Sequence, residues 1–218
     1  MPAQRPMSDR GSAPSHDGQL TLVRRTLWRT LQQGHNLSLV GPAHSGKSRI
    51  LKAICRRWPA RFPDARLPVY LDIQPLADAT QEEYLARLAQ GLIRALRRAG
   101  SRNRSKPAGH HASALISSHL LAMLAGRTFR GVRVCYVLDH FEYAACNRHL
   151  NPAFFGALRS LCSQPEVSII CATRAPLWQF GKLSSCTGSA FPNVFLTLNA
   201  GYSRRDGRNP LRIATYGN

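Results

Sequence analysis

Apolar residues follow two patterns along this chain: short continuous runs, and longer stretches with an apolar residue every three or four positions. The short runs are rich in Val, Ile and Leu and predict buried strands. They lie at residues 37–40, 69–73, 132–139, 167–172 and 191–198. The longer stretches predict amphipathic helices. These lie at residues 20–33, 80–100, 112–125 and 153–161, and a further helix begins after residue 48.

The alternation of strands and helices predicts an α/β fold, with a parallel sheet covered by helices on both faces. Two helix starts also carry capping signals. The segment Thr80-Gln81-Glu82-Glu83 has the spacing of a capping box. Asn151 followed by Pro152 is typical of an N-cap with proline at the first helical position.

Length and composition fit one such domain of residues 19–198 between two polar tails, residues 1–18 and 199–218. We expect both tails to be disordered, and we expect residues 101–111 to form a basic loop. No apolar run approaches the ~20 residues of a membrane span. Six cysteines without paired spacing favour a reducing, cytoplasmic location. The net charge of +19 has two interpretations, a polyanionic partner such as nucleic acid or the arginine-rich composition of a GC-rich genome.

The most informative motif follows the first predicted strand: Gly41, four residues, then Gly46-Lys47-Ser48. This is the P-loop pattern, and its strand and helix flanks are in the expected order. Such a loop and the helix that follows it direct backbone N–H groups at phosphates. We expect Lys47, at a solvent-facing loop end, to reach the β- and γ-phosphates, and Ser48 to bind Mg²⁺. The predicted nucleotide contacts are Gly41, Pro42, Ala43, His44, Ser45, Gly46, Lys47, Ser48 and Arg49.

Acidic and polar residues end the other predicted strands. Asp139 closes the run VRVCYVLD, and an acid in this place holds the Mg²⁺ that the P-loop hydroxyl also binds. Asp72 ends the second strand and has two interpretations, a site residue or the start of a turn. Thr173 and Arg174 follow the fourth strand, where a polar side chain can sense the γ-phosphate or orient water.

Several segments together resemble one family. They are the P-loop, VYLDIQ at 69–74, VLDHFE at 137–142, ATRAPL at 172–177 and FPNVF at 191–195. Over residues 20–198 the chain resembles the AAA-like P-loop ATPase domain of the signal-transduction ATPases with numerous domains, a NACHT-related group. The resemblance implies a sheet of strand order 5-1-4-3-2, binding of ATP with Mg²⁺, and switching between a closed state and an open, often oligomeric, signalling state. It also implies that Asp139 is the Mg²⁺-associated acid and Thr173 the sensor.

The sequence departs from this family at two places. Family members usually have an acid after the strand-ending Asp to activate water, and here the residue is His140. Glu142 lies two positions further, roughly 6 Å along an extended strand, which is too far unless the loop folds back. A histidine ring is itself a possible base near neutral pH. The family also continues into a helical lid and usually a winged helix. We therefore expect a truncated chain or one half of a split system.

Four classes of function stay open: a slow ATPase switch, a module that binds ATP without hydrolysis, a DNA-associated ATPase of the loader or transposition-regulator type, and a small-molecule kinase. The kinase ranks last, because we see no segment for a substrate pocket or lid. Partners compatible with these classes are ATP, a second copy, a protein that supplies the lid or effector, and non-specific nucleic acid. The residues His140, Cys146 and His149 do not have the spacing of a structural zinc site.

Overall fold

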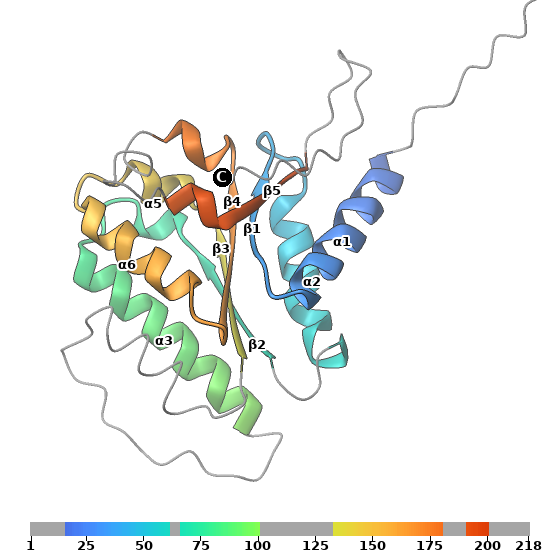
Figure 1. The fold of residues 1–218 in the computed structure, drawn as a ribbon, viewed down its shortest axis with the longest axis horizontal. Coiled ribbons are helices and arrows are strands. Elements are labelled where there is room, and N and C mark those ends of the chain that lie inside the picture. Colours follow the sequence, from blue (N-terminus) through green and yellow to red (C-terminus); the bar gives the residue numbers. More distant parts are fainter. Residues whose placement is uncertain (1–15, 62–65, 101–132, 181–190, 201–218) are drawn as a thin grey trace, which may run out of the picture.

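A five-stranded parallel sheet forms the centre of the computed structural model, which describes residues 16–61, 66–100, 133–180 and 191–200 (Figure 1). The strands are β1 Asn36–Val40, β2 Arg66–Asp72, β3 Arg133–Asp139, β4 Val167–Thr173 and β5 Phe195–Asn199. They are ordered β2-β3-β4-β1-β5, and every neighbouring pair is parallel. Read from the opposite edge this is 5-1-4-3-2, so the predicted fold class and strand order are confirmed.

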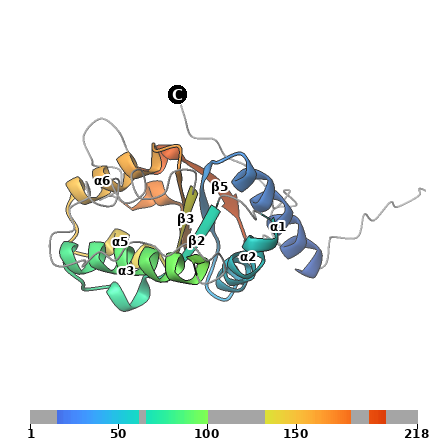
Figure 2. The same cartoon turned by 90° about the horizontal axis from the view of Figure 1, so that it is seen from below.

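Helices cover both faces of the sheet. On one face lie α1 His16–Gln32 and α2 Lys47–Arg61; on the other lie α3 Gln81–Gly100, α5 Glu142–Cys146 and α6 Pro152–Cys162 (Figures 1 and 2). Short 3₁₀ turns are η1 Gln74–Leu76, η2 Leu177–Gln179 and η3 Phe191–Val194. None of the helices in the described ranges combines the length and apolar composition of a membrane span.

Element boundaries differ from the sequence expectation at several places, and β2 begins at Arg66, three residues before the predicted start. Helix α1 begins at His16, four residues before the predicted start. The predicted strand at 191–198 begins only at Phe195, because its first four residues form η3, which contains Pro192. Asn199, expected in the tail, pairs with Val40 of β1. The predicted helix at 112–125, the loop at 101–111, and the tails at 1–15 and 201–218 lie outside the described residues.

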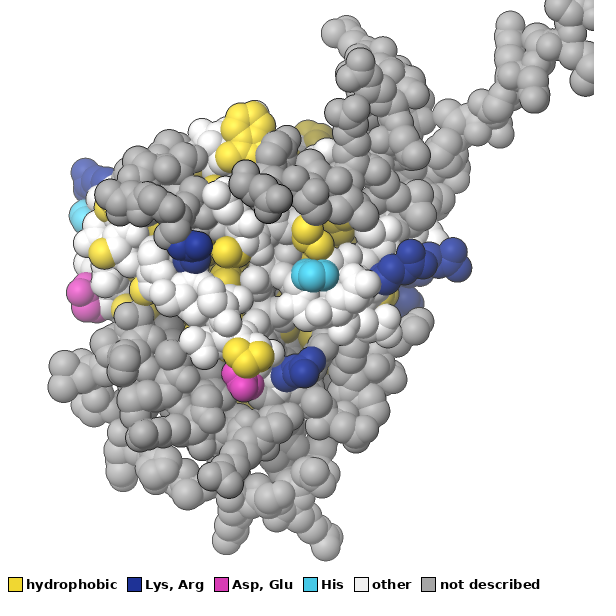
Figure 3. Space-filling model, in the orientation of Figure 1, with side chains coloured by type: hydrophobic (Ala, Val, Ile, Leu, Met, Phe, Trp, Pro, Cys, Tyr) yellow, Lys and Arg dark blue, Asp and Glu magenta, His cyan; other side chains and the backbone are white. Residues whose placement is uncertain are grey.

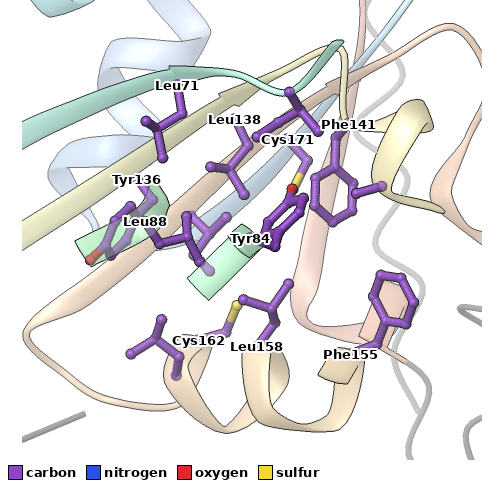
Figure 4. Packing of buried hydrophobic residues seen from close by; sticks show 14 of the residues in the cluster. Leu71, Tyr84, Leu88, Tyr136, Leu138, Phe141, Phe155, Leu158, Cys162 and Cys171 are labelled. Carbon is purple, nitrogen blue, oxygen red and sulfur yellow. The ribbon is translucent and has the colours of Figure 1, made fainter. Parts of the chain in front are cut away.

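Strand alternation divides the apolar residues between two cores. In β3, Val134, Tyr136 and Leu138 face α3 and α6, where Figure 4 shows Tyr136 and Leu138 with Tyr84 and Phe155. Cys135 and Val137 face the opposite core. That core packs α1 and α2 on the sheet through Val23, Leu27, Leu31, Ile50, Leu51, Ile54 and Trp58. By the same alternation, Asp139 belongs to the face that α2 covers.

Both predicted caps are present. The Thr80 N–H donates to Glu83 Oε2 at 2.8 Å, and the Glu83 N–H donates back to Thr80 Oγ1 at 3.3 Å. At α6, the Phe154 N–H donates to Asn151 Oδ1 at 3.0 Å. These bonds satisfy N–H groups that lack partners inside a helix, which explains why α3 and α6 begin where the sequence predicts.

Two helical glycines provide a matched test of how tightly α3 is packed. A Cβ on Gly91 would lie 2.9 Å from Val69 Cγ1 and 3.0 Å from Leu71 Cδ2 of β2, whereas a Cβ on Gly156 of α6 meets nothing within 4 Å. We expect Gly156→Ala to raise the free energy of unfolding by about 0.5–1 kcal/mol. Gly91→Ala should lower it by about 1 kcal/mol, because overpacking outweighs the gain in helix propensity. Urea denaturation measures both changes, and equal effects would show that α3 does not pack this closely.

Candidate nucleotide-binding site

The segment between β1 and α2 is a tight loop at the carboxyl edge of the sheet. The Gly41 N–H donates to the Thr173 carbonyl at 3.1 Å, which fixes the start of the loop beside β4. The loop then turns through left-handed backbone at His44, with φ 60°, and at Gly46, with φ 86°. Glycine adopts this conformation without the steric cost that a Cβ imposes. Helix α2 begins at Lys47, so its first N–H groups lie at the end of the loop.

The predicted contact residues of this loop differ in exposure. Pro42, Ala43, His44 and Arg49 are exposed, Ser45, Gly46 and Ser48 are half-buried, and Gly41 and Lys47 are buried. The exposed residues leave one side of the loop open to solvent, and a ligand can approach the backbone from that side.

Lys47 lies inside the loop rather than at its solvent-facing end. Its Nζ donates to the carbonyls of Gly41 at 2.6 Å and Pro42 at 2.8 Å, and contacts Ser45 Oγ at 3.3 Å. Only 7% of Lys47 is exposed. Burial lowers the pKa of the ammonium, and the negative charges of Glu142 and then Asp139 offset this effect. The expectation of a solvent-facing lysine was wrong, because the loop carbonyls draw the ammonium inward.

Asp139 is a fully buried carboxylate at the end of β3. Its Oδ2 accepts from the Tyr70 hydroxyl at 2.8 Å, and its Oδ1 accepts from the His140 N–H at 3.1 Å. Burial and the bond to Asp139 together raise the pKa of Tyr70 well above its usual value. Within the described part of the chain, the Ser48 hydroxyl has no hydrogen-bond partner. A carboxylate and a hydroxyl are oxygen ligands of the kind that Mg²⁺ prefers, so these residues fit the predicted metal.

His140 turns toward β2. Its backbone has φ 56°, and its Nδ1–H donates to Asp72 Oδ1 at 2.9 Å. Asp72 also accepts from the Gln74 N–H at 3.1 Å, as the interpretation of Asp72 as the start of a turn predicts. A role of Asp72 in the site stays a prediction. The Phe141 N–H next donates to the Ala172 carbonyl at 2.8 Å, which draws the chain back over β4.

This turn changes the position of Glu142. The separation of 6 Å assumed an extended strand, but β3 ends at Asp139 and the left-handed residue folds the chain back. Glu142 begins α5, its side chain is 13% exposed, and its Oε1 lies 3.1 Å from Nε of Arg174. Its Oε2 has no hydrogen-bond partner among the described residues. Among the neighbouring charges, Glu142 has the largest effect on the pKa of Lys47, so its carboxylate lies within electrostatic range of the ammonium.

The predicted sensor, Thr173, is fully buried at the end of β4. Its hydroxyl donates to the Ala175 carbonyl at 2.7 Å, so the side chain stabilises the turn after the strand. The next residue, Arg174, is 56% exposed and pairs with Glu142. Its charge also lowers the pKa of Lys47, which places the guanidinium near the loop.

Sequence reasoning missed the parts that Tyr70 and Arg174 have in this site. Tyr70 is two positions before Asp72 on β2. Because side chains alternate along a strand, both lie on the same face of the sheet as Asp139. That alternation could have identified Tyr70. The pairing of Arg174 with Glu142 had no comparable signal, because it depends on the turn at His140.

We compared the chain with known proteins. Neither a family model nor a curated protein matches it. Solved structures do match. A Walker-type ATPase of Pyrococcus abyssi has a TM-score of 0.58 at 17% identity, over 94% of this chain and 58% of its own. The ORC2 protein of Aeropyrum pernix has a TM-score of 0.58 at 11% identity, and the match covers 88% of this chain and 50% of the ORC2 chain. Cdc6p of Pyrobaculum aerophilum has a TM-score of 0.51 at 14% identity, and the match covers 89% of this chain and 47% of Cdc6p.

The chain shares with these structures a P-loop NTPase-like α/β fold. The chain spans about half the length of these structures. They are a Cdc6p, an ORC2 protein and a Walker-type ATPase, and none of them singles out the signal-transduction group. Membership of that group therefore stays a prediction from the sequence resemblance.

Proposed function

We propose that this chain binds ATP with Mg²⁺ at the loop after β1 and acts as a nucleotide-dependent switch that hydrolyses ATP slowly. The observation that carries the proposal is the buried ammonium of Lys47, held by two loop carbonyls where α2 begins. A fixed positive charge at a helix N-terminus is suited to bind a polyphosphate. The similar ORC2 structure is a complex with ADPNP and ADP, which supports the choice of an adenine nucleotide.

Each side chain of the site has a role in this proposal. Loop N–H groups and Lys47 bind the β- and γ-phosphates, while Ser48 and Asp139 hold Mg²⁺. The metal, when bound, neutralises charge on the phosphate oxygens. Tyr70 positions Asp139 through its bond to Oδ2. Thr173 fixes the end of β4 beside Gly41.

Slow hydrolysis follows from what the two candidate bases already contact. A general base must lie within hydrogen-bond reach of the attacking water. The Nδ1–H of His140 is bonded to Asp72 on the β2 side, away from the strand that leads into the loop. Glu142 lies within electrostatic range of Lys47, but Arg174 holds one of its carboxylate oxygens. We therefore expect inefficient activation of water, because His140 is turned away from the loop and only Oε2 of Glu142 is left without a partner among the described residues.

Arg174 is our candidate for the residue that reports the γ-phosphate. It lies near Lys47 and is paired with a single carboxylate oxygen of Glu142. A γ-phosphate beside Lys47 would compete for the guanidinium, because arginine binds phosphate through two parallel hydrogen bonds. Movement of Arg174 toward phosphate would release Glu142 at the start of α5. This exchange couples the nucleotide to a helix on the opposite face of the sheet.

The family resemblance extends the proposal to assembly. A switch of this group would act with a second copy or with a protein that supplies a lid and an effector, in the cytoplasm. The partner protein would determine which signal the switch detects, because the residues of the described site serve nucleotide binding.

Retention of intact nucleotide tests the proposal. The full chain is incubated with labelled ATP and Mg²⁺, freed of unbound nucleotide by rapid gel filtration, and assayed over time for ATP and ADP. We expect one retained nucleotide per chain, mostly ATP, with ADP accumulating far more slowly than the typical enzyme turnover of about 10 s⁻¹. Complete absence of ADP would favour the module that only binds ATP. Full conversion at an ordinary turnover rate would exclude a slow switch.

A further inference from the structure

One helical layer of this protein has no negative side chain over most of its length. Residues 18–63 contain no Asp or Glu. The same stretch contains nine basic residues, Arg24, Arg25, Arg29, Lys47, Arg49, Lys52, Arg56, Arg57 and Arg61. It includes α1 from its third residue and all of α2. The fold places both helices on one face of the sheet (Figure 2).

Most of these basic side chains are exposed, whereas Lys47 is buried inside the loop. The apolar residues of α1 and α2 are buried against the sheet, and Arg25, Arg29, Arg56 and Arg57 are exposed. The two helices contact each other through Trp28 and Trp58, whose ring centroids are 5.7 Å apart. Figure 2 shows α1 and α2 side by side, and in Figure 3 dark blue side chains without magenta neighbours project from the flank where α1 lies. We call this exposed surface of α1 and α2 the basic face.

The opposite layer has a mixed charge. Its helix α3 has four exposed arginines, Arg87, Arg94, Arg97 and Arg98, but also Glu82 and Glu83 in its first turn. Other described acids of that side are Asp78, Glu142 and Glu166. Arginine-rich composition alone explains basic residues on both layers. It does not explain why residues 18–63, which form most of α1 and all of α2, contain no acid.

We propose that the basic face binds the phosphate backbone of a nucleic-acid duplex. Arginines four apart, such as Arg25 and Arg29, are about 6 Å apart along a helix. Duplex DNA presents one phosphate per 3.4 Å of axis on each strand, so one helix can contact several phosphates. Arginine also matches phosphate with paired hydrogen bonds. This function is additional to nucleotide binding and does not depend on it.

Two other anionic partners fit the surface less well. A peripheral membrane helix inserts exposed apolar residues between lipids. The apolar residues of α1 and α2 are instead buried, and the large exposed apolar side chain of the described residues is Trp178, at η2. Single-stranded nucleic acid is held by aromatic rings that stack on bases. Trp58 is fully buried and Trp28, which packs against it, is only partly exposed, so the described basic face has no row of exposed aromatic rings.

Matched arginine variants test the proposal. The full chain, Arg25/Arg29/Arg56/Arg57→Ala, and Arg87/Arg94/Arg97/Arg98→Ala are titrated into a fluorescent 25-base-pair DNA duplex between 50 and 200 mM salt. Both variants lose four charges from exposed helix positions, and circular dichroism and thermal melting confirm their folding. We expect the basic-face variant to bind about 10²-fold more weakly at 50 mM salt, with a salt slope smaller by roughly three to four. The α3 variant should lose less than tenfold.

Three outcomes would overturn the proposal. They are no binding of the parent to the duplex, an equal loss of affinity in both variants, and tighter binding of the parent to a single strand or to phosphatidylserine vesicles than to the duplex. Equal loss would mean that binding depends on net charge rather than on the basic face. Lys47→Ala serves as an internal control, since we expect it to bind the duplex as the parent does. The ATP-binding and duplex-binding measurements therefore test the nucleotide site and the basic face independently.

Discussion

Lys47→Ala is expected to abolish measurable ATP binding while the protein remains folded. The substitution removes the fixed ammonium that the loop holds through the Gly41 and Pro42 carbonyls. Hydrogen bonds that involve a charged group contribute about 1.5–3 kcal/mol each. Loss of two such contacts to phosphate corresponds to roughly 10²–10⁴-fold weaker binding, which is beyond most calorimetric titrations of a micromolar site.

The fold should survive this change because two effects on stability oppose each other. The alanine removes a buried ammonium, whose desolvation is the main reason for its lowered pKa. It also leaves two loop carbonyls without their donor. We expect a net change in the free energy of unfolding of less than about 2 kcal/mol. Arg56→Ala, which removes a charge from the exposed side of the same helix, should bind ATP normally. Equal ATP affinity in Lys47→Ala and the parent would refute the P-loop assignment.

His140→Glu is expected to increase ATP turnover by about 10²–10⁴-fold, which is the usual value of general-base assistance. In the parent, the imidazole is bonded to Asp72 on β2 at 2.9 Å. A glutamate here would be repelled by Asp72 rather than attracted. It would therefore turn away from β2, toward the loop and its water. ATP binding should be unchanged, because Lys47, Ser48 and Asp139 keep their contacts.

His140→Gln is the matched control for this variant. Glutamine has no basic group at neutral pH and no charge for Asp72 to repel, so turnover should stay at or below that of the parent. The measurement is steady-state phosphate release under saturating Mg-ATP for all three proteins. If the parent is already fast and His140→Glu slows it, His140 is a working base and our explanation of slow hydrolysis is wrong. If all three bind ATP and remain inert, the identity of residue 140 does not limit hydrolysis.

Much of the fold could be predicted because its signals are local. The local signals are the five apolar runs, the two caps and the spacing from Gly41 to Ser48. The strand order, in contrast, followed from the family resemblance. The 3₁₀ turn before β5 was missed because Phe191, Val194 and Phe195 are apolar in either conformation. Asp139 could be assigned to the face of α2 only after the alternation in β3 was known.

The charge arrangement of the site could not be predicted, because it depends on one backbone angle. A non-glycine residue with positive φ is uncommon, and no sequence signal marks His140 as one. That angle sends the imidazole toward Asp72 and brings Glu142 to Arg174 and the loop. A spacing argument along an extended strand therefore gave the wrong distance for Glu142. The buried position of Lys47 was missed for a related reason, since its partners are carbonyls of a loop whose path the motif does not specify.

A crystal structure of the full chain with Mg²⁺ and a non-hydrolysable ATP analogue tests the central claim most directly. Our account predicts the β- and γ-phosphates against the loop N–H groups and Lys47, with Mg²⁺ between Ser48 and the Asp139 carboxylate. It also predicts that Arg174 leaves Glu142 for the γ-phosphate. A nucleotide bound elsewhere on the protein, or triphosphate density without contact to Lys47, would contradict it.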